Sequence, residues 1–323
     1  MAATYVNAVY YPSWAVYKEK PPSSLDVANI THIFYAFMGI NDDGTLRFLD
    51  EWADIEKQVD DEKGCLKALK KLKDSNPNLR TLISVGGVDW EHPKTAEEGN
   101  NFILLLRDLR CSLPKDDFLI TTALPAAEYC LRNINLLHLS QLIDFLNLMS
   151  YDFTGSWGEV AGHHAQLFAR DTADDSVHPA LRACGCDGID YVLSQNFPPG
   201  KALLGVPVYA RYFPRASRPG ESNKHAGEME YKDVPDDWVH HAAVDEEHGT
   251  ASFLDKTRCG KGFASFDVPQ TVKIKASFVQ AMLLGGLFYW TGSADKAGEL
   301  SLVATGAREL RCRKSQSQNQ SQL

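Results

Sequence analysis

The sequence predicts an α/β fold, a TIM-type (β/α) barrel in which parallel strands are covered by helices. Short apolar runs alternate with amphipathic helical stretches along nearly the whole chain, as in a parallel sheet with crossover helices. The length of 323 residues suits such a barrel with an insertion, since these barrels take about 250 residues. Polar and aromatic residues follow many apolar runs, as on a barrel rim. A doubly wound sheet, the alternative, would gather them at one switch point.

The expected strands are apolar runs rich in β-branched and aromatic residues, at 7–11, 32–38, 80–85, 118–124, 146–151, 202–209 and 287–290. Helical stretches separate them at 64–74, 99–112, 138–145, 178–194 and 271–284. Leu66, Leu69 and Leu72 recur at spacings of three residues, which places them on one helical face. The glycine-rich motifs of nucleotide-binding folds are absent from the sequence.

Residues 212–262 interrupt this alternation, because they are rich in glycine, proline, histidine and acidic residues. We expect them to form a small inserted α+β lobe, with the barrel made of residues 1–211 and 263–311. Residues 312–323 are nearly all polar. Because such a segment cannot bury an apolar surface, we expect it to be a disordered tail.

Charge and composition exclude several classes of protein. With 33 Lys and Arg against 42 Asp and Glu, the formal net charge is -9, which argues against a nucleic-acid partner. The longest apolar run, 281–290, is too short to cross a bilayer, so no membrane association is expected. The first residues lack the basic and apolar regions of a signal peptide. We therefore expect a cytoplasmic monomer, or a secreted one if a leader is missing from this sequence.

The spacing of the cysteines does not indicate a metal site. There are seven of them, an odd number, and only Cys184 and Cys186 stand close together in the sequence. A structural zinc site needs four ligands, usually in two closely spaced pairs. We therefore expect Cys184 and Cys186 to be structural, and we predict neither a metal nor any other cofactor.

The sharpest chemical signal is the acidic pair in Val88-Asp89-Trp90-Glu91. If this segment ends a strand, Asp89 and Glu91 point to the same face. Two neighbouring carboxyl groups at a barrel mouth cannot both ionise easily, so one of them keeps its proton near neutral pH and can act as a general acid. The other interpretation is an ordinary solvated acidic loop before Pro93.

Aromatic and polar residues also end other predicted strands. Tyr151 and Asp152 follow the apolar run 146–149, and Trp290 ends the run 287–290. An indole at a strand end can form the floor of a sugar site, although each aromatic residue alone is also compatible with core packing. Their common position at the strand ends predicts that they line one cleft.

These motifs, in this order, resemble glycoside hydrolase family 18, the chitinases, and most closely its small fungal and bacterial members. The resemblance spans about 7–311 and rests on motifs that end successive strands: Tyr10-Tyr11-Pro-Ser-Trp14, Ile33-Phe34-Tyr35-Ala36-Phe37, Ser84-Val85-Gly86-Gly87, Asp89-Trp90-Glu91, Met149-Ser-Tyr151-Asp152, Gly205-Val-Pro-Val-Tyr209-Ala-Arg211 and Gly286-Leu-Phe-Tyr-Trp290. It implies a barrel enzyme that cleaves β-1,4-linked N-acetylglucosamine polymers, with chitin or its oligosaccharides as partner and no cofactor.

The resemblance also implies a role for each site residue. Glu91 matches the general acid that protonates the glycosidic oxygen. Asp89 matches the acid that holds the substrate's N-acetyl group, whose carbonyl oxygen attacks the anomeric carbon. Tyr151 matches the residue that hydrogen-bonds the acetamido oxygen. The residues that would contact sugar are Tyr10, Phe37, Trp90, Met149, Asp152, Tyr209, Arg211 and Trp290.

One departure from the family's pattern is large. The family's acidic motif lies on a fourth strand, separated from the third by a helix, whereas here Gly87 runs directly into Val88 and Asp89. Roughly thirty to forty residues, about one strand–helix unit, are therefore missing. We expect the third and fourth strands to be fused near 84–91. The barrel then closes with seven strands or keeps a gap.

The departure also changes the acidic motif itself, because Gly87 stands where the family has an acidic neighbour of Asp89. The sequence thus predicts a glycosidase, a chitinase-type hydrolase with substrate-assisted retaining catalysis, whose activity is impaired by the deletion. The alternative is a non-catalytic protein that binds chitin oligosaccharides.

Overall fold

The computed structural model describes residues 5–41, 43–86, 92–169, 177–178, 181–258 and 260–312. Its main sheet contains seven parallel strands in the order β6, β2, β1, β15, β9, β8, β7, and β3 pairs antiparallel with the end of β2. These strands are β1 (Val6–Pro12), β2 (His32–Ile40), β3 (Leu46–Phe48), β6 (Arg80–Val85), β7 (Thr121–Pro125), β8 (Phe145–Met149), β9 (Ala202–Pro207) and β15 (Gly286–Trp290).

The sheet curls into a partial barrel, which confirms the predicted fold class. Among the described residues, β6 pairs only with β2 and β7 pairs only with β8, so the two outer strands leave a gap between them. A gap is one of the two outcomes expected from a missing strand–helix unit. Residues 87–91, where the sequence predicts the fused strand, lie outside the described residues.

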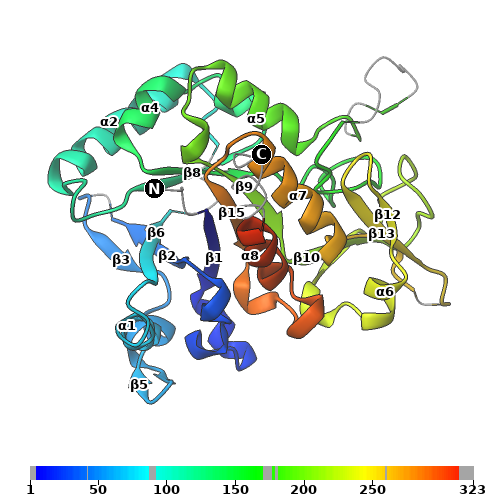
Figure 1. The fold of residues 1–323 in the computed structure, drawn as a ribbon, viewed down its shortest axis with the longest axis horizontal. Helices are drawn as coiled ribbons and strands as arrows, with labels where there is room; N and C mark the ends of the chain where they lie inside the picture. Colours follow the sequence, from blue (N-terminus) through cyan, green and yellow to red (C-terminus); the bar gives the residue numbers. More distant parts are fainter. Residues whose placement is uncertain are drawn as a thin grey trace, which may run out of the picture.

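Helices surround the sheet (Figure 1). The α-helices are α1 (Cys65–Asp74), α2 (Ala96–Ser112), α3 (Glu128–Leu131), α4 (Leu136–Leu142), α5 (Gly185–Ser194), α6 (Asp236–His240), α7 (Pro269–Ala281) and α8 (Leu302–Cys312). Short 3-10 or π turns and a two-stranded ribbon make up the other elements. They are η1 (Ser13–Lys18), η2 (Pro22–Ser24), η3 (Val27–Asn29), η4 (Trp52–Glu56), β4 (Gln58–Val59), β5 (Glu62–Lys63), η6 (Pro199–Lys201), η7 (Tyr231–Asp233), η8 (Gly292–Ala294) and η9 (Gly298–Leu300).

The central strands are buried on both faces, as expected for a parallel sheet between helices and a barrel interior. Every residue of β1 and of β9 is buried. The side chains that fill the barrel interior are Val6, Ala8, Tyr10, Phe34, Ala36, Leu203 and Phe288. Their neighbours along each strand, such as Val9 and Ile33, join the larger core beneath the helices. This alternation places Tyr10 inside the barrel.

A second sheet follows β9. It is antiparallel, in the order β11, β10, β14, β13, β12, and α6 lies beside it at one end of the molecule (Figure 1). Its strands are β10 (Tyr209–Phe213), β11 (Gly227–Glu230), β12 (Ala243–Asp245), β13 (Thr250–Asp255) and β14 (Gly262–Ser265). The inserted lobe predicted at 212–262 falls within this sheet, while its boundary as a separate domain remains a prediction.

The predicted strand 118–124 starts too early. In the structure β7 begins at Thr121, because the amide of Phe118 bonds to the carbonyl of Pro114 in a turn. The amide of Ile120 then donates to the Asp144 carboxylate over 2.8 Å. Neither amide is free to join a strand ladder.

The predicted helix 178–194 also starts too early, since α5 begins at Gly185. The side-chain amide of Gln166 donates to the carbonyls of Leu181 and Ala183, which fixes the preceding segment as a loop. The predicted strand 202–209 is really two strands, because β9 ends at Pro207 and β10 begins at Tyr209 in the second sheet.

At the C-terminus, α8 runs to Cys312, and residues 313–323 of the predicted tail lie outside the described residues. Within the described part of the chain, no helix combines the length and the apolar character needed to cross a membrane.

The outward face of β6 is poorly covered, as the missing unit would lead one to expect. Ile83 is 52% exposed and Val85 is 43% exposed. On the neighbouring strand β2, Ile33 is fully buried beneath helices. The two isoleucines therefore point outward from adjacent strands, but only Ile33 is covered by helices.

This difference predicts unequal effects of truncation. Ile33→Ala should lower the free energy of unfolding by about 3 kcal/mol, because it leaves a cavity in the core. Ile83→Ala should lower it by less than about 1 kcal/mol, because the side chain is already half in water. Urea denaturation of both variants measures the two values. Equal losses would contradict an uncovered face of β6.

A histidine at the amino-terminal end of the barrel strands, His32, is kept neutral. His32 lies at the start of β2, and its Nδ1 shares a hydrogen bond with the Thr31 hydroxyl over 2.9 Å. Its ring is edge-on to that of Phe145, with the ring centroids 5.8 Å apart. Burial, together with the charge of Arg80, lowers the pKa of His32 from 6.5 to about 4. Between these two pH values, the unfolded chain binds a proton that the folded chain does not.

We therefore expect the free energy of unfolding to fall as the pH is lowered from 6.5 to about 4. The contribution of His32 is on the order of 3 kcal/mol. Urea unfolding at several pH values would measure this dependence for the wild type and for His32→Gln. The variant should lose the part of the pH dependence that His32 contributes. An NMR titration that gives His32 an ordinary pKa would contradict the prediction.

Candidate functional site

Aromatic side chains from three strands meet at the carboxyl ends of the barrel strands. Tyr10 on β1 and Trp290 on β15 have ring centroids 5.2 Å apart, and Phe37 on β2 stacks against Trp290 at 5.8 Å. Trp14, in η1, adds a further ring 6.2 Å from Phe37 and 6.5 Å from Trp290. We call Tyr10, Trp14, Phe37 and Trp290 the aromatic floor. Such a surface suits the apolar face of a sugar ring.

The position of Phe37 depends on an irregularity in β2. Ala36 pairs with Ser84 and Met38 pairs with Val85, so Phe37 has no partner in the ladder with β6. An extra residue of this kind re-aims its side chain. In this case it brings the ring of Phe37 over Trp290, two strands away in the sheet order.

A buried polar group supports the aromatic floor from below. The side-chain amide of Asn147 on β8 donates to the Tyr10 hydroxyl over 2.9 Å, across the inside of the barrel. Asn147 is fully buried. Because a buried amide of this kind needs a partner, the bond fixes the height of the Tyr10 ring in the barrel.

An ionic network stands beside the aromatic floor, centred on Asp152. One carboxylate oxygen of Asp152 accepts hydrogen bonds from the Tyr209 hydroxyl over 2.7 Å and from Arg211 Nε over 2.8 Å. Arg211 also contacts Glu228 through Nη1 at 3.0 Å, because β10 and β11 place these two residues opposite each other. The guanidinium lies 4.5 Å from the ring of Trp157.

The surroundings of Asp152 keep it charged. Burial alone would raise the pKa of Asp152, but His164 and Arg211 outweigh burial and hold this pKa below its usual range. His164 is fully buried with Nδ1 3.7 Å from the carboxylate, and burial lowers its own pKa. Burial likewise raises the pKa of Tyr209, which keeps its hydroxyl proton as a donor. The site thus presents an ionised carboxylate held by fixed donors.

These two groups border one open cavity of about 310 Å³. That volume lies at the lower end of the range for small-molecule pockets, which starts at about 300 Å³. The second sheet contributes to its wall through Arg211, Glu228 and Glu230. The remaining walls include Pro12, Trp14, Lys18, Lys20, Asp152, Tyr209, Lys232, Trp290 and Ser293.

The structure brings most of the predicted site residues together. Met149 and Tyr151 pack against the inner barrel cluster, and the Tyr151 ring lies 6.3 Å from that of Tyr209. Of the predicted sugar-contacting residues, Asp152, Tyr209, Arg211 and Trp290 line the cavity. Tyr10 and Phe37 belong to the aromatic floor, and Met149 packs against the inner barrel cluster. The predicted catalytic residues Asp89 and Glu91, and Trp90 between them, lie outside the described residues.

Sequence reasoning missed several residues of the site. Trp14 belongs to the motif Tyr10-Tyr11-Pro-Ser-Trp14 but was not predicted to contact sugar. An indole four residues beyond Tyr10, past the end of the strand, is the signal in the sequence. Trp157 lies in the Gly- and Ser-rich segment 155–158, where an exposed indole is unusual. His164 and Glu228 carry no local signal, because only the packing of the loop and of β11 brings them to Asp152 and Arg211.

The described residues of this cleft do not gather a set of metal ligands. Within the part of the chain that the structure describes, the group of side chains that could together hold a metal is Cys184, Cys186 and Asp187, at the start of α5. The predicted absence of a cofactor is untested.

Comparison with known proteins assigns the family. The profile of the glycosyl hydrolases of family 18 matches residues 6–89 and 87–295. The chain belongs to this family, and its relatives place it among the chitinase-type glycosidases. Endochitinase 1 of Metarhizium robertsii is 28% identical over 379 aligned positions, which cover 96% of this chain and 86% of that protein. Chitinase 1 of Aphanocladium album is 28% identical over 368 positions, covering 95% and 85%.

Solved structures show the same fold. The group IV chitinase of Ostrinia furnacalis superposes with a TM-score of 0.80 at 24% identity, covering 95% of this chain and 99% of that one. The catalytic domain of chitinase B from Arthrobacter TAD20 gives a TM-score of 0.81 at 20% identity, covering 95% of each chain.

The alignments also bear on the missing unit. They extend over 379 and 368 positions, more than the 323 residues of this chain, so the relatives have residues that this chain lacks. The two segments matched by the family profile meet at 87–89. This is the place where the sequence predicts the deletion and where the described sheet has its open side.

Two substitutions compare the partly exposed partner of Arg211, Asp152, with its more exposed partner, Glu228. The Arg211 side chain is 11% exposed and the Asp152 side chain 38%, so Asp152→Asn, which removes the main counter-charge of Arg211, should lower the free energy of unfolding by about 1 to 2 kcal/mol after screening by solvent. Glu228→Gln should cost less than about 1 kcal/mol, because the Glu228 side chain is 65% exposed. Urea unfolding measures both. A larger loss for Glu228→Gln would contradict the assignment of Asp152 as the central partner.

Proposed function

We propose that this protein recognises chitin oligosaccharides and hydrolyses their β-1,4-N-acetylglucosamine linkages by the substrate-assisted retaining route. The observation that carries the proposal is the aromatic floor beside the Asp152 network, at the strand ends where a barrel has its active site. A structure of the Ostrinia furnacalis group IV chitinase contains allosamidin, and one of its group II chitinase contains a penta-N-acetylchitooligosaccharide. A net charge of -9 also suits an uncharged glycan.

The binding steps follow from the described residues. The indole of Trp290 provides the stacking surface for a sugar ring, with Phe37 and Trp14 extending it along the cleft. Asp152 and Arg211 are polar groups held in fixed positions, which can take up hydroxyl and acetamido groups of the sugar. Tyr151 lies between these two parts, against Tyr209 and Phe288. It can donate a hydrogen bond to the acetamido oxygen.

The bond-breaking steps are assigned to Asp89 and Glu91 by the family resemblance. Glu91 gives its proton to the glycosidic oxygen, so the leaving sugar departs as an alcohol. The acetamido carbonyl oxygen attacks the anomeric carbon while Asp89 holds the N–H of the same group. Water then opens the cyclic intermediate, with Glu91 taking back a proton, and the configuration at the anomeric carbon is retained.

We further propose that the deletion slows this reaction. Gly87, two residues before Asp89, stands where the family has the acidic residue with which its Asp shares a proton. Removing a strand–helix unit also changes the sheet next to the acidic pair, and displacements of about 1 Å can cost about 100-fold in rate. Trp290 lies on β15, in the middle of the sheet and away from both open edges, whereas Phe37 lies on β2, next to the edge strand β6.

The central position of Trp290 favours one alternative function, a non-catalytic protein that binds chitin oligosaccharides. In it, the aromatic floor and the Asp152 network would hold the sugar while the acidic pair fails to cleave it. Binding and turnover therefore have to be measured on the same samples.

The test is release of a fluorogenic group from an N-acetylglucosamine oligomer by the wild type and Glu91→Gln. We expect slow turnover that falls by at least about 100-fold in the variant, since a positioned general acid contributes that much or more. Glu97→Gln, at an exposed position on α2, is the matched control and should change nothing. All samples must first be shown to melt cooperatively.

A calorimetric titration with a chitin oligosaccharide separates the two functions. Trp290→Ala should weaken binding about tenfold in either case, because it removes the stacking surface. Binding without turnover in the wild type would support the non-catalytic alternative. Turnover that survives Glu91→Gln would refute the assigned mechanism, and the absence of both activities from a folded protein would refute the proposed function.

A further inference from the structure

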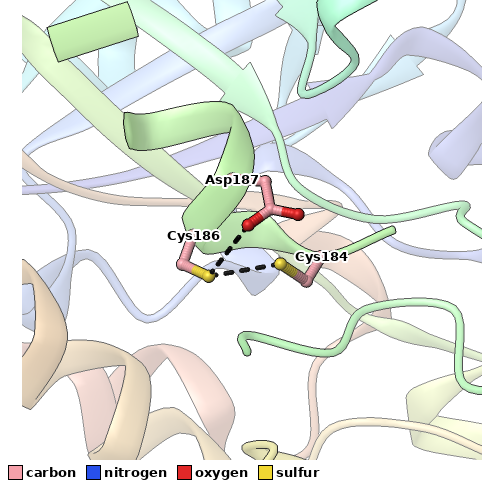
Figure 2. Close-up of side chains that lie close together, drawn as sticks. All are labelled: Cys184, Cys186 and Asp187. Atoms are coloured by element: carbon pink, nitrogen blue, oxygen red, sulfur yellow. Dashed lines mark hydrogen bonds between the residues drawn. The ribbon is translucent and has the colours of Figure 1, made fainter. Parts of the chain in front are cut away.

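We propose that Cys184 and Cys186 form a redox-active dithiol that closes reversibly to an intramolecular disulfide when hydrogen peroxide oxidises it. The two Sγ atoms lie 3.2 Å apart, and Figure 2 shows the sulfurs facing each other at the start of α5. This separation is shorter than a usual contact between two sulfur atoms, and a thiol hydrogen bond joins them. The thiols therefore stand where a bond between them can form with little movement.

The fold holds both thiols in place through their backbone. Cys184 is the extended residue that precedes α5, and Gly185 and Cys186 are the first two residues of the helix. The amide of Gly185 donates to the carbonyl of Gln166 over 3.0 Å, and that of Cys186 donates to the carbonyl of Leu167 over 2.8 Å. These two hydrogen bonds join the start of α5 to the loop that contains Gln166 and Leu167.

The residue between the two cysteines has to be small. A Cβ atom on Gly185 would lie 3.2 Å from the Cβ of Ser150, closer than most real contacts of that kind. Glycine also gives the three-residue segment 184–186 the backbone freedom that closing a small disulfide ring needs. The sequence predicts a structural role for the pair, and in the structure the start of α5 turns both sulfurs to the same side.

The two thiols differ in a way that assigns a role to each. Cys184 is 1% exposed, whereas Cys186 is only half-buried. The hydrogen bond with Cys186 and burial both raise the pKa of Cys184, which keeps its proton. The hydrogen bond from Cys184, helped by the amide of Ala169, lowers the pKa of Cys186 despite burial and the carboxylate of Asp187. Cys186 is thus the attacking thiolate and Cys184 the resolving thiol.

The reaction balances with peroxide as the oxidant. The Cys186 thiolate attacks one oxygen of hydrogen peroxide, the O–O bond breaks, and with one proton a water leaves, so that Cys186 becomes a sulfenic acid. The Cys184 sulfur then attacks the Cys186 sulfur, its proton goes to the departing hydroxyl, and a second water leaves. Two thiols and one peroxide give one disulfide and two waters, and an external dithiol reverses the change.

A metal site is the competing assignment for the same side chains, since Asp187 lies beside the two thiols. Two thiolates on one zinc ion stand about 3.8 Å apart, as follows from Zn–S bonds of about 2.3 Å in tetrahedral geometry. The observed 3.2 Å is shorter than that spacing. The geometry therefore favours bond formation between the sulfurs over shared metal coordination.

The test uses the full-length protein with excess peroxide, followed by alkylation of the remaining thiols, trypsin and mass spectrometry. Cleavage after Arg182 and Lys201 releases the peptide 183–201, whose only cysteines are Cys184 and Cys186. We expect oxidised samples to lose both alkylation sites in this peptide and to regain both after treatment with dithiothreitol. The matched control is Cys111→Ser, which removes an exposed cysteine on α2 and should leave this result unchanged.

Two single variants test the division of roles without relying on the disulfide. Cys184→Ser should stop at a sulfenic acid on Cys186, which dimedone traps, whereas Cys186→Ser should leave Cys184 largely unreacted. The proposal is overturned if both thiols of the folded wild type stay open to alkylation after peroxide. It is also overturned if one equivalent of Zn²⁺, added to the reduced protein, blocks alkylation of both.

Discussion

The parallel ladder between β1 and β15 is the interaction on which the site depends most directly. It joins the first and last strands of the barrel, with Val6 opposite Gly286 and Val9 opposite Tyr289. The two backbones approach so closely that a Cβ on Gly286 would lie 1.9 Å from the carbonyl oxygen of Val6. Glycine alone fits there. Through this ladder, Tyr10 and Trp290 come from opposite ends of the chain to form one aromatic surface.

Local patterns in the sequence were sufficient for the parts of the fold that obey them. Apolar runs gave β1, β2, β6, β8, β9 and β15 to within a few residues, and aromatic residues at their ends gave most of the aromatic floor. Two errors in element bounds come from side chains that bond to a distant backbone. Asp144 accepts a hydrogen bond from the amide of Ile120, and Gln166 donates to two carbonyls before α5. Glu228 was missed for another reason, since only the β10–β11 pairing brings it to Arg211.

The missing unit was visible in the sequence because a parallel crossover has a minimum length, and no such length separates Gly87 from Asp89. The sequence could not decide between closure with seven strands and an open side, because that choice depends on how far the remaining strands can tilt. The described residues keep the open side between β6 and β7. The gap therefore lies near β2, the strand that carries Phe37, with β6 between them, and away from β15, the strand that carries Trp290.

The open side also changes how the chain can assemble. In a closed barrel, two routes of strand pairing connect the first strands to the middle ones. Among the described residues, β1, β2 and β6 are joined to β9, β8 and β7 only through β15, which begins at Gly286. Its contacts with β1 span almost the whole sequence, and contacts of such high separation form slowly. During synthesis the two half-sheets therefore stay unconnected until the last strand has been made. Until then their apolar edges are accessible to chaperones and proteases.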